Sequence, residues 1–317
     1  MNTEYPRLSI VIPIRNEAPN IPVLCKELIQ AVGPLGLDWE ILWIDDASTD
    51  DSGEAIAGLK NNSVKMNLIR LVRNYGQAAA LACGFEEARG DIIITIDGDL
   101  QNDPADIPKL LACLEQGFDV VCGWRENRRD DPFRSFMSRL ANRVIRKITD
   151  CSINDYGCTL RAYKRAALGG LQIMGDMHRL LPAYLAWQGA KITEIPVHHR
   201  SRRAGKSKYS VLGRTWKVIL DAFLLKFYFS YITRPIHFFG SVSLGIILTA
   251  LALEVFVIFR RIFMGGAWLS PLFFLGLFLF SGALFFLFLG VLADLLVRNF
   301  MLSHNMKPFH LAFKKQL

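Results

Sequence analysis

Two pairs of acidic residues follow apolar runs in the first hundred residues of the sequence. Asp45 and Asp46 close one such run, and Asp97 and Asp99 close another. Two carboxylates one residue apart at a strand end can converge on one point, and their hard oxygens suit Mg²⁺ or Mn²⁺. We therefore predict that the second pair binds a divalent cation that bridges to a diphosphate. An Asp-rich loop without a ligand would show the same pattern.

Basic side chains gather after residue 120. Residues 1–120 hold 9 basic and 19 acidic side chains, whereas residues 121–235 hold 22 basic and 8 acidic ones. An acidic segment followed by a basic one fits a site that binds a cation and then several phosphates. It fits equally a soluble domain with a basic collar against anionic lipid. The two uses are compatible in one protein.

Two groups within the basic region are candidates to bind a phosphate. Arg134, Ser138 and Asn142 recur every four residues and therefore share one face of a predicted helix. Arg on such a face can contact phosphate with both arms of its guanidinium. Arg202 and Lys208 lie in a Gly-containing stretch that could close over a diphosphate. A surface that faces lipid headgroups would explain any single one of these side chains as well.

Short apolar runs alternate with helical patterns over the first 125 residues. The predicted strands are Leu8–Pro13, Glu40–Asp45, Leu68–Val72, Asp91–Asp97 and Asp119–Cys122, and the predicted helices are Ile21–Val32, Ser52–Leu59, Gln77–Ala88 and Ala105–Glu115. This alternation predicts an α/β fold with a mostly parallel, doubly wound sheet, which binds ligands at the carboxyl ends of its strands. Neither a G-x-G-x-x-G fingerprint nor a P-loop occurs in the sequence.

Two long apolar runs near the end of the chain predict membrane-spanning helices. They cover about residues 236–259 and 272–293, and each reaches the roughly 20 residues that a spanning helix needs. Lys and Arg flank both runs on one side and are sparse in the connection, which places both termini in the cytoplasm. Residues 211–235 read as amphipathic helices in the membrane interface. We therefore expect a catalytic domain over residues 1–210, interfacial helices over 211–235, two spans over 236–299 and a cytoplasmic tail over 300–317.

The cysteines and the overall charge exclude several classes of protein. None of the six cysteines forms a C-x-x-C pair, so we expect reduced thiols in a cytoplasmic compartment rather than a disulfide framework or a zinc site. The net charge of +8 would suit a nucleic-acid binder, but the basic side chains crowd toward the apolar runs. We therefore expect no nucleic-acid partner. A membrane scaffold without catalytic activity would explain the apolar runs but not the carboxylates at strand ends.

Several segments occur in an order that resembles family 2 glycosyltransferases of GT-A fold. They are "IVIPIRNE", "WIDDASTDDS", "VRNYGQAAALACGF", "TIDGDLQNDP" and "DYGCTLRAYKR". The resemblance covers essentially the whole chain and is greatest to the polyprenyl-phosphate branch, which includes dolichol-phosphate mannose synthases. Within that branch the segments "RNYGQ" and "IPVHH" look most like the undecaprenyl-phosphate 4-deoxy-4-formamido-L-arabinose transferases. The resemblance implies a multi-pass protein of the bacterial inner membrane that forms a tetramer.

The resemblance also implies roles for individual residues. It places Asp97, Asp99 and Gln101 at a Mg²⁺ or Mn²⁺ ion and assigns donor nucleotide binding to Pro13, Asn16, Glu17, Asp45, Asp46, Arg73 and Asp97. Asp46 could instead cap a turn. The resemblance assigns acceptor phosphate binding to Arg134, Ser138, Asn142, Arg161, Arg202 and Lys208. It assigns catalytic roles to Asp99, Arg125 and Asp155. Asp155 would act as a base or orient the acceptor. Some relatives carry an acid where this chain has Cys158, which leaves both roles for Asp155 open.

The implied reaction is the inverting transfer of a sugar from a nucleotide-sugar, preferably UDP-linked, to a polyprenyl phosphate. The second ionisation of a phosphate monoester has a pKa of about 6, so its oxygen can attack the sugar without a strong base. A GDP-mannose-dependent synthase is the alternative within the branch. A processive polysaccharide synthase would share the aspartates, but it would carry a Q-x-x-R-W motif, which this sequence lacks.

Overall fold

The structure is a computed structural model that describes residues 7–59, 64–126, 142–149, 151–169, 177–200, 234–265 and 269–303, with a few positions between 220 and 231. The chain forms two compact units, residues 1–225 and residues 226–317. The interfacial helices expected over residues 211–235 lie largely outside the described residues, although the described positions from 220 to 231 are helical. Each unit is an independent body with its own packing.

The first unit is built on a seven-stranded sheet in the order β3-β2-β1-β4-β6-β5-β7. The strands are β1 Leu8–Ile14, β2 Trp39–Asp45, β3 Lys65–Arg70, β4 Ile92–Thr95, β5 Val120–Trp124, β6 Arg161–Lys164 and β7 Ile192–Pro196. Neighbouring strands are parallel except at β6, which runs antiparallel to both β4 and β5. The predicted mostly parallel sheet is confirmed. The antiparallel strand β6 was not predicted, because its four residues carry too short a pattern to distinguish from a loop.

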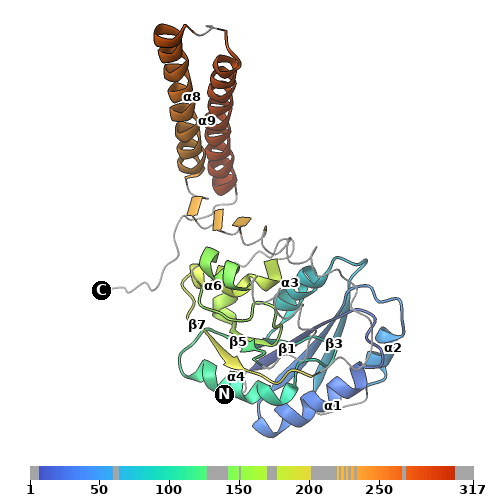
Figure 1. Ribbon diagram of the computed structural model, residues 1–317. Helices are drawn as coiled ribbons and strands as arrows, with labels where there is room; N and C mark the ends of the chain where they lie inside the picture. The colour runs from blue at the N-terminus through green and yellow to red at the C-terminus, as the bar shows by residue number, and fades with distance from the viewer. Residues whose placement is uncertain are drawn as a thin grey trace. The chain divides into compact units, whose positions relative to one another are not determined.

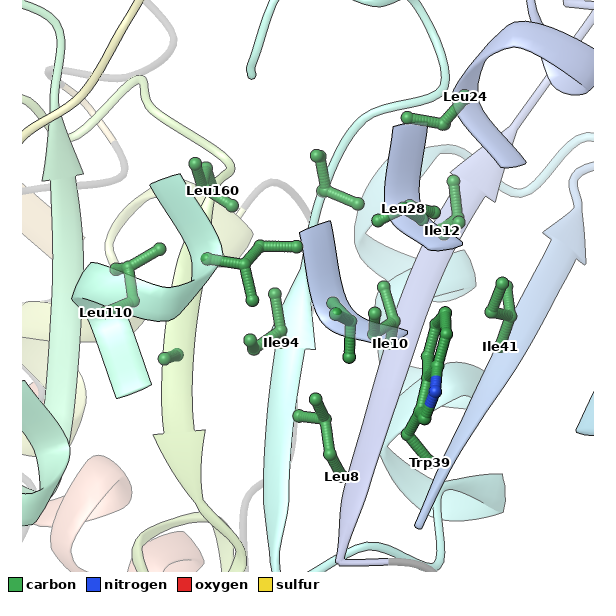
Figure 2. Packing of buried hydrophobic residues seen from close by; sticks show 14 of the residues in the cluster. Leu8, Ile10, Ile12, Leu24, Leu28, Trp39, Ile41, Ile94, Leu110 and Leu160 are labelled. Carbon is green, nitrogen blue, oxygen red and sulfur yellow. The ribbon is translucent and has the colours of Figure 1, made fainter. Parts of the chain in front are cut away.

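Alternating side chains of β1 face two different layers of helices. Leu8, Ile10 and Ile12 are fully buried in one core with residues of α1 (Ile21–Val32) and α4 (Ile107–Glu115). Val11 points to the other face and packs with α3 (Gln77–Glu87). Figure 1 shows α1 and α4 on one side of the sheet and α3 on the other, and Figure 2 shows the first core from close by. Because both faces are covered there, the central strands β1 and β4 are almost continuously apolar.

Helix boundaries follow local sequence signals. α1 begins at Ile21, as predicted, and the structure places a proline in its first turn. The region expected to form one helix from Ala105 divides into a 3₁₀ turn, Pro104–Asp106, followed by α4. Asp103 caps the turn, since its Oδ1 accepts a hydrogen bond of 3.0 Å from the amide of Ala105. Further short helices are α2 Ser52–Ala57 and α6 Leu181–Trp187, and residues 142–149 are also helical. Single 3₁₀ turns occur at Gly33–Leu35, Arg165–Leu168 and Met177–Arg179.

Strand β3 begins three residues before the predicted strand. It spans Lys65–Arg70, whereas the apolar pattern predicted Leu68–Val72. β3 lies at the edge of the sheet and none of its six side chains is buried. Its position depends on backbone pairing with β2, from Glu40–Lys65 to Asp45–Arg70, and not on burial. Hydropathy therefore carried little information about where this strand begins.

The second unit is a hairpin of two long apolar helices, α8 (Pro235–Met264) and α9 (Pro271–Ser303). Both are long and apolar enough to cross a membrane, by length and composition. Small residues of α9 recur every seven positions where α8 passes, at Gly276, Ala283 and Gly290. The Ser243 hydroxyl of α8 donates to the Ala283 carbonyl at 2.7 Å, and a Cβ at Gly290 would lie 2.8 Å from Cβ of Phe239. These contacts hold the two backbones close together.

Candidate functional site

The topology brings three predicted acidic or polar loops to one edge of the sheet. β1 pairs in parallel with β2 on one side and with β4 on the other, so the carboxyl ends of all three strands are neighbours. Asn16 and Glu17 follow β1, Asp45 and Asp46 lie at the end of β2, and the Asp97–Asp99 pair follows β4. This is the edge at which parallel α/β sheets bind ligands.

Asp97 and Asp99 form a concentrated negative charge. Asp99 is buried and Asp97 is partly buried. Burial, and then the charges of Asp99 and Glu17, raise the pKa of Asp97 to about 7, although a hydrogen bond with Thr159 and the charge of Arg125 oppose the shift. The carboxylate oxygens of Asp97 and Asp99 fit a hard divalent cation, which would relieve the repulsion between the two charges. The described residues contain no cluster of three His, Cys, Asp or Glu ligands, which is compatible with Mg²⁺, since that ion takes one or two carboxylates plus substrate phosphates.

The turn that carries the acidic pair contains one residue with left-handed backbone, and this residue is Leu100, at a φ of 61°, and not Gly98. Gly98 is needed for close approach instead, because a Cβ there would lie 2.8 Å from Cγ2 of Ile14 at the end of β1. Asp99 stabilises the turn by accepting a 3.1 Å hydrogen bond from the amide of Gln101. The side chain of Gln101 is partly buried.

Gln77 is a site residue that the sequence analysis did not single out. It is the first residue of α3, and its Nε2 donates a hydrogen bond of 2.7 Å to Oδ1 of Asp97. The signal was present in the segment "RNYGQ", which contributed to the family resemblance without a role for its last residue. Only the packing of α3 against the sheet shows that this residue faces the acidic pair.

The loops after β1 and β2 are joined through the predicted donor-binding residues. Asn16, at a φ of 56°, accepts a 2.8 Å hydrogen bond on its Oδ1 from the amide of Thr49. The backbone amide of Asn16 donates to Oγ of Ser48 at 3.0 Å, and the backbone amide of Glu17 donates to Oγ of Ser52 at the same distance. Asn16 therefore shapes the loop with its side chain, and contact with a nucleotide stays a prediction.

The two consecutive aspartates at the end of β2, Asp45 and Asp46, both accept hydrogen bonds within the protein. Asp45 is fully buried and accepts a 2.8 Å hydrogen bond from the amide of Ser48, with Arg70 at 3.5 Å from its other oxygen. Asp46 accepts hydrogen bonds of 2.7 and 2.9 Å from the amides of Tyr75 and Gly76. Asp46 thus binds the segment before α3, and the contact within the local turn, to Ser48, is made by Asp45. These contacts leave base and ribose binding by Asp45 and Asp46 as a prediction.

Two further predicted donor-binding residues lie at the same edge with less engagement. Pro13 is partly exposed near the end of β1, where it is in register with Ile44 of β2. Arg73 is exposed, and its guanidinium lies 4.7 Å from the ring centre of Tyr75, which is itself 52% exposed. A stacked Arg–Tyr pair on an exposed loop presents both a charge and an aromatic face. Its use in donor binding is untested.

Arg125 and Asp155 form a closely paired ion pair beside the acidic residues. The Nε and Nη2 atoms of Arg125 donate to the two carboxylate oxygens of Asp155 at 2.8 and 3.0 Å. The amide of Gly157 donates a further 3.0 Å bond to Asp155, whose side chain is only 3% exposed. With both oxygens engaged, Asp155 is suited to hold Arg125 in place. The alternative role as a proton acceptor would require it to give up one of these bonds.

The predicted acceptor-binding residues are described only in part. Arg134, Ser138, Arg202 and Lys208 lie outside the described residues. Asn142 is buried, and its Nδ2 donates to the carbonyl of Asn154 at 2.7 Å. Arg161 is 4% exposed and donates to the carbonyls of Tyr156 and His178 at 2.7 and 2.9 Å. Both side chains are buried and bound to backbone carbonyls, so they support the fold, and their contact with an acceptor phosphate stays a prediction.

The segment after β7 is held by hydrogen bonds and ion pairs beside the loop that follows Asp97 and Asp99. The Arg200 amide donates to the Gln101 carbonyl at 2.9 Å. Its guanidinium pairs with Glu27 of α1 and with Asp103, each at 2.7 Å. The His198 amide donates to Asp106 at 2.6 Å. The chain thus enters the basic stretch that follows Arg200 from a point next to the acidic loop, an arrangement that sequence spacing alone did not indicate.

Comparison with proteins of known fold identifies the architecture. The first unit resembles glucosyl-3-phosphoglycerate synthase from Mycobacterium tuberculosis, solved with Mn²⁺, UDP and glucosyl-3-phosphoglycerate, with a TM-score of 0.52. The sequences are 20% identical, and the match covers 70% of this chain and 80% of that one. The protein therefore has a GT-A type α/β fold, followed by two long apolar helices.

Sequence comparison then identifies the family. The profile of glycosyl transferase family 2 matches residues 9–171. Dodecaprenyl-phosphate galacturonate synthase of Rhizobium johnstonii is 36% identical over 299 residues, which are 92% of this chain and 88% of that protein. Undecaprenyl-phosphate 4-deoxy-4-formamido-L-arabinose transferase of Salmonella paratyphi B is 36% identical over 296 residues with the same coverage. The chain belongs to glycosyltransferase family 2 and is an enzyme of that family.

Proposed function

We propose that this protein transfers a sugar from a nucleotide-sugar to a polyprenyl phosphate at a membrane surface. The observation that carries the proposal is the meeting of the Asp97–Asp99 pair with the Arg125–Asp155 ion pair at one sheet edge. The two apolar helices supply a means of membrane anchoring. Both curated relatives are named for polyprenyl phosphates and align over 92% of this chain, which supports the acceptor class.

The donor diphosphate would be held by the acidic pair and by Arg125. Asp97 and Asp99 would bind Mg²⁺ or Mn²⁺, with Gln101 beside them, and the ion would neutralise charge that develops on the leaving diphosphate. Arg125 would contact the same phosphates, because Asp155 fixes the plane of its guanidinium. The loops of Asn16, Glu17 and Asp46 would enclose the nucleoside. Mn²⁺ and UDP in the solved structural relative favour a UDP-linked donor.

The acceptor would act as its own nucleophile. A phosphate monoester is largely ionised near neutral pH, because its second pKa is about 6. One phosphate oxygen would form the new bond to the anomeric carbon while the bond from that carbon to the nucleoside diphosphate breaks, with inversion. No side chain needs to remove a proton in this step. The engagement of both Asp155 oxygens is therefore compatible with full activity, and favours the acceptor-orienting role through Arg125 over the role of base.

The membrane sets where this reaction would take place. A polyprenyl phosphate cannot leave the headgroup region without exposing its chain, at about 0.8 kcal/mol per CH₂. The basic segment from Arg125 to Lys208 would meet the phosphate there, with Arg134, Ser138, Arg202 and Lys208 as the remaining candidate contacts. We further propose a bacterial inner-membrane location with both termini in the cytoplasm, on the basis of the Lys and Arg that flank the apolar helices.

A donor screen with the full chain tests the proposed function. UDP-linked and GDP-linked sugars carrying a radiolabel would be incubated with undecaprenyl phosphate and Mg²⁺ or Mn²⁺, and label in the lipid extract would be counted. We expect transfer from a UDP-linked sugar, and transfer from GDP-mannose alone would replace the donor assignment. The two relatives are named for different sugars, so the screen must include both uronic and amino sugars.

Asp99→Asn is the matched loss-of-function variant in that assay. Removing one carboxylate leaves the charge of the diphosphate uncompensated, and we expect transfer to fall about 100-fold or more, a loss of several kcal/mol of transition-state stabilisation. Asp91→Asn, an exposed aspartate at the opposite end of β4, is the control and should keep full activity. Undiminished transfer by Asp99→Asn, or by the unaltered protein in excess EDTA, would show that the reaction does not use this cation site.

A further inference from the structure

The first turn of α3 reaches the acidic pair through one side chain. Nε2 of Gln77 donates a 2.7 Å hydrogen bond to Oδ1 of Asp97, and both side chains are partly buried. The amide nitrogen has no lone pair available to bind a cation, so this group can restrain the carboxylate but cannot replace it as a ligand. The contact occupies one side of Oδ1 and fixes the rotation of the carboxylate next to Asp99.

A second acidic residue fixes the position of Gln77 itself. Asp46 accepts hydrogen bonds from the amides of Tyr75 and Gly76, at 2.7 and 2.9 Å, immediately before α3 begins. Gly76 has a φ of 93° and a ψ of 165°, a backbone conformation open essentially only to glycine. The end of β2 therefore determines where α3 starts and how its first side chain points. A continuous series of contacts joins Asp46 to Asp97 through residues 75–77.

We infer that Gln77 is a positioning residue for the divalent cation, held in place by Asp46. This inference rests on the proposed function, because it assumes that Asp97 and Asp99 bind the cation. Partners of metal ligands commonly set ligand orientation, and their loss typically reduces metal affinity or activity by about 10–100-fold. The segment "RNYGQ" thus connects the acidic motif at the end of β2 to the acidic motif after β4 through hydrogen bonds.

The test measures binding of Mn²⁺ alone to the full chain, without nucleotide or lipid. Free Mn²⁺ would be counted by its electron paramagnetic resonance signal for the unaltered protein, Gln77→Met, Asp99→Asn and Gln116→Met. Methionine keeps the length of glutamine but cannot donate a hydrogen bond. Gln116 is exposed at the end of α4 and remote in the fold from the acidic pair, so it controls for the substitution itself. Thermal unfolding of each variant shows whether the fold is retained.

We expect Gln77→Met to weaken Mn²⁺ binding by about tenfold or more, while its unfolding temperature stays unchanged. Gln116→Met should bind Mn²⁺ as tightly as the unaltered protein. Equal Mn²⁺ affinity in Gln77→Met and the unaltered protein, with Asp99→Asn impaired, would overturn the inference and leave the proposed function standing. If the unaltered protein binds Mn²⁺ no better than Asp99→Asn, the cation site in the proposed function is wrong, and the inference fails with it. The two failures are therefore distinguishable.

A double-mutant cycle tests the part played by Asp46. Asp46→Asn should weaken Mn²⁺ binding when Gln77 is present, because the loop of Tyr75 and Gly76 loses part of its anchor. In the Gln77→Met background the same change should have little further effect, since there is no longer an amide to position. Independent, additive losses in the two backgrounds would remove Asp46 from the series of contacts.

Discussion

At the scale of single residues, the site is organised by side chains that hold other side chains. Asp155 engages Arg125, Gln77 engages Asp97, and Asp46 holds the backbone before Gln77. Such contacts matter because a displacement of about 1 Å at a reacting group can reduce a rate about 100-fold. Some residues that the sequence analysis assigned to ligand binding or catalysis therefore hold other groups of the site in position.

The pair of Arg125 and Asp155 provides the residue-scale prediction. If Asp155 acts by holding Arg125, then Arg125→Ala and Asp155→Ala should lower transfer by similar factors, and the double variant should be little worse than either single one. Asp155→Asn, which keeps one acceptor oxygen, should recover part of the activity. The measurement is kcat/KM for the donor at saturating lipid acceptor, with the pH profile of each variant.

A base role for Asp155 predicts a different outcome. Asp155→Asn would then be as impaired as Asp155→Ala, and the acidic limb of the pH profile would disappear in both. If the double variant loses kcat/KM by the product of the two single-variant factors, Arg125 and Asp155 act independently.

At the scale of elements, contacts between loops decide how the strand ends are arranged. Asp106, at the start of α4, is fully buried and joins three segments. Burial acts to raise the pKa of Asp106, but hydrogen bonds from Lys109 and from the backbone and ring of His198 outweigh it and lower the pKa below the ordinary value. A carboxylate bound more favourably in the folded protein stabilises that protein while it is ionised.

The stability prediction follows from the sign of this shift. The folded-state pKa of Asp106 lies below its unfolded value, so its contribution is present above the unfolded pKa and is lost as pH falls through the folded one. Asp106→Asn should lower the free energy of unfolding at neutral pH by about 1–3 kcal/mol and should flatten the acid-induced loss below about pH 4. Thermal unfolding between pH 3 and pH 8 measures this, with Asp91→Asn as the control. An unchanged acid limb in Asp106→Asn would contradict the role.

The helix hairpin offers a second prediction for an element. A side chain at Gly290 would collide with Cβ of Phe239, whereas Gly282 on the same helix has open space around it. Gly290→Leu should destabilise the packing of α8 against α9 by about 1–3 kcal/mol, while Gly282→Leu should change it little. Thermal unfolding in detergent compares the two variants. Equal effects would mean that the close approach of the helices is not what holds them together.

At the scale of the whole molecule, the candidate site and the two apolar helices lie in different units. The first unit contains every described candidate for donor binding, and the second contains both helices able to span a membrane. The tetramer implied by resemblance stays a prediction, which the mass of the detergent-solubilised protein would test.

Orientation in the membrane is the prediction at this scale. Leu269 lies in the connection between α8 and α9 and is 71% exposed, so a cysteine there should react from outside with an impermeant thiol reagent. A cysteine at Gln116, on the catalytic unit, should react only after the membrane is permeabilised. All six native cysteines are unpaired, and five of them are buried, so the unsubstituted protein serves as the background control. The reverse labelling pattern would place the catalytic unit on the other side.

The sequence by itself determined the elements whose patterns are local. α1 was predicted with its observed bounds, and β1 and β2 to within one residue, because helical periodicity and continuous apolar runs are patterns of adjacent residues. The apolar helices were equally plain from length and composition. The acidic pairs at the strand ends were also visible, since their spacing and their place after apolar runs require no partner from elsewhere in the chain.

Only the tertiary structure decided which side chains meet. The antiparallel β6, the start of the edge strand β3, the burial of Arg161 and the contact of Gln77 with Asp97 all depend on residues distant in sequence. Arg161 illustrates the physical reason. An arginine in a basic, motif-rich segment reads as a phosphate ligand, yet the fold buries this one, and its guanidinium donates to the backbone carbonyls of Tyr156 and His178.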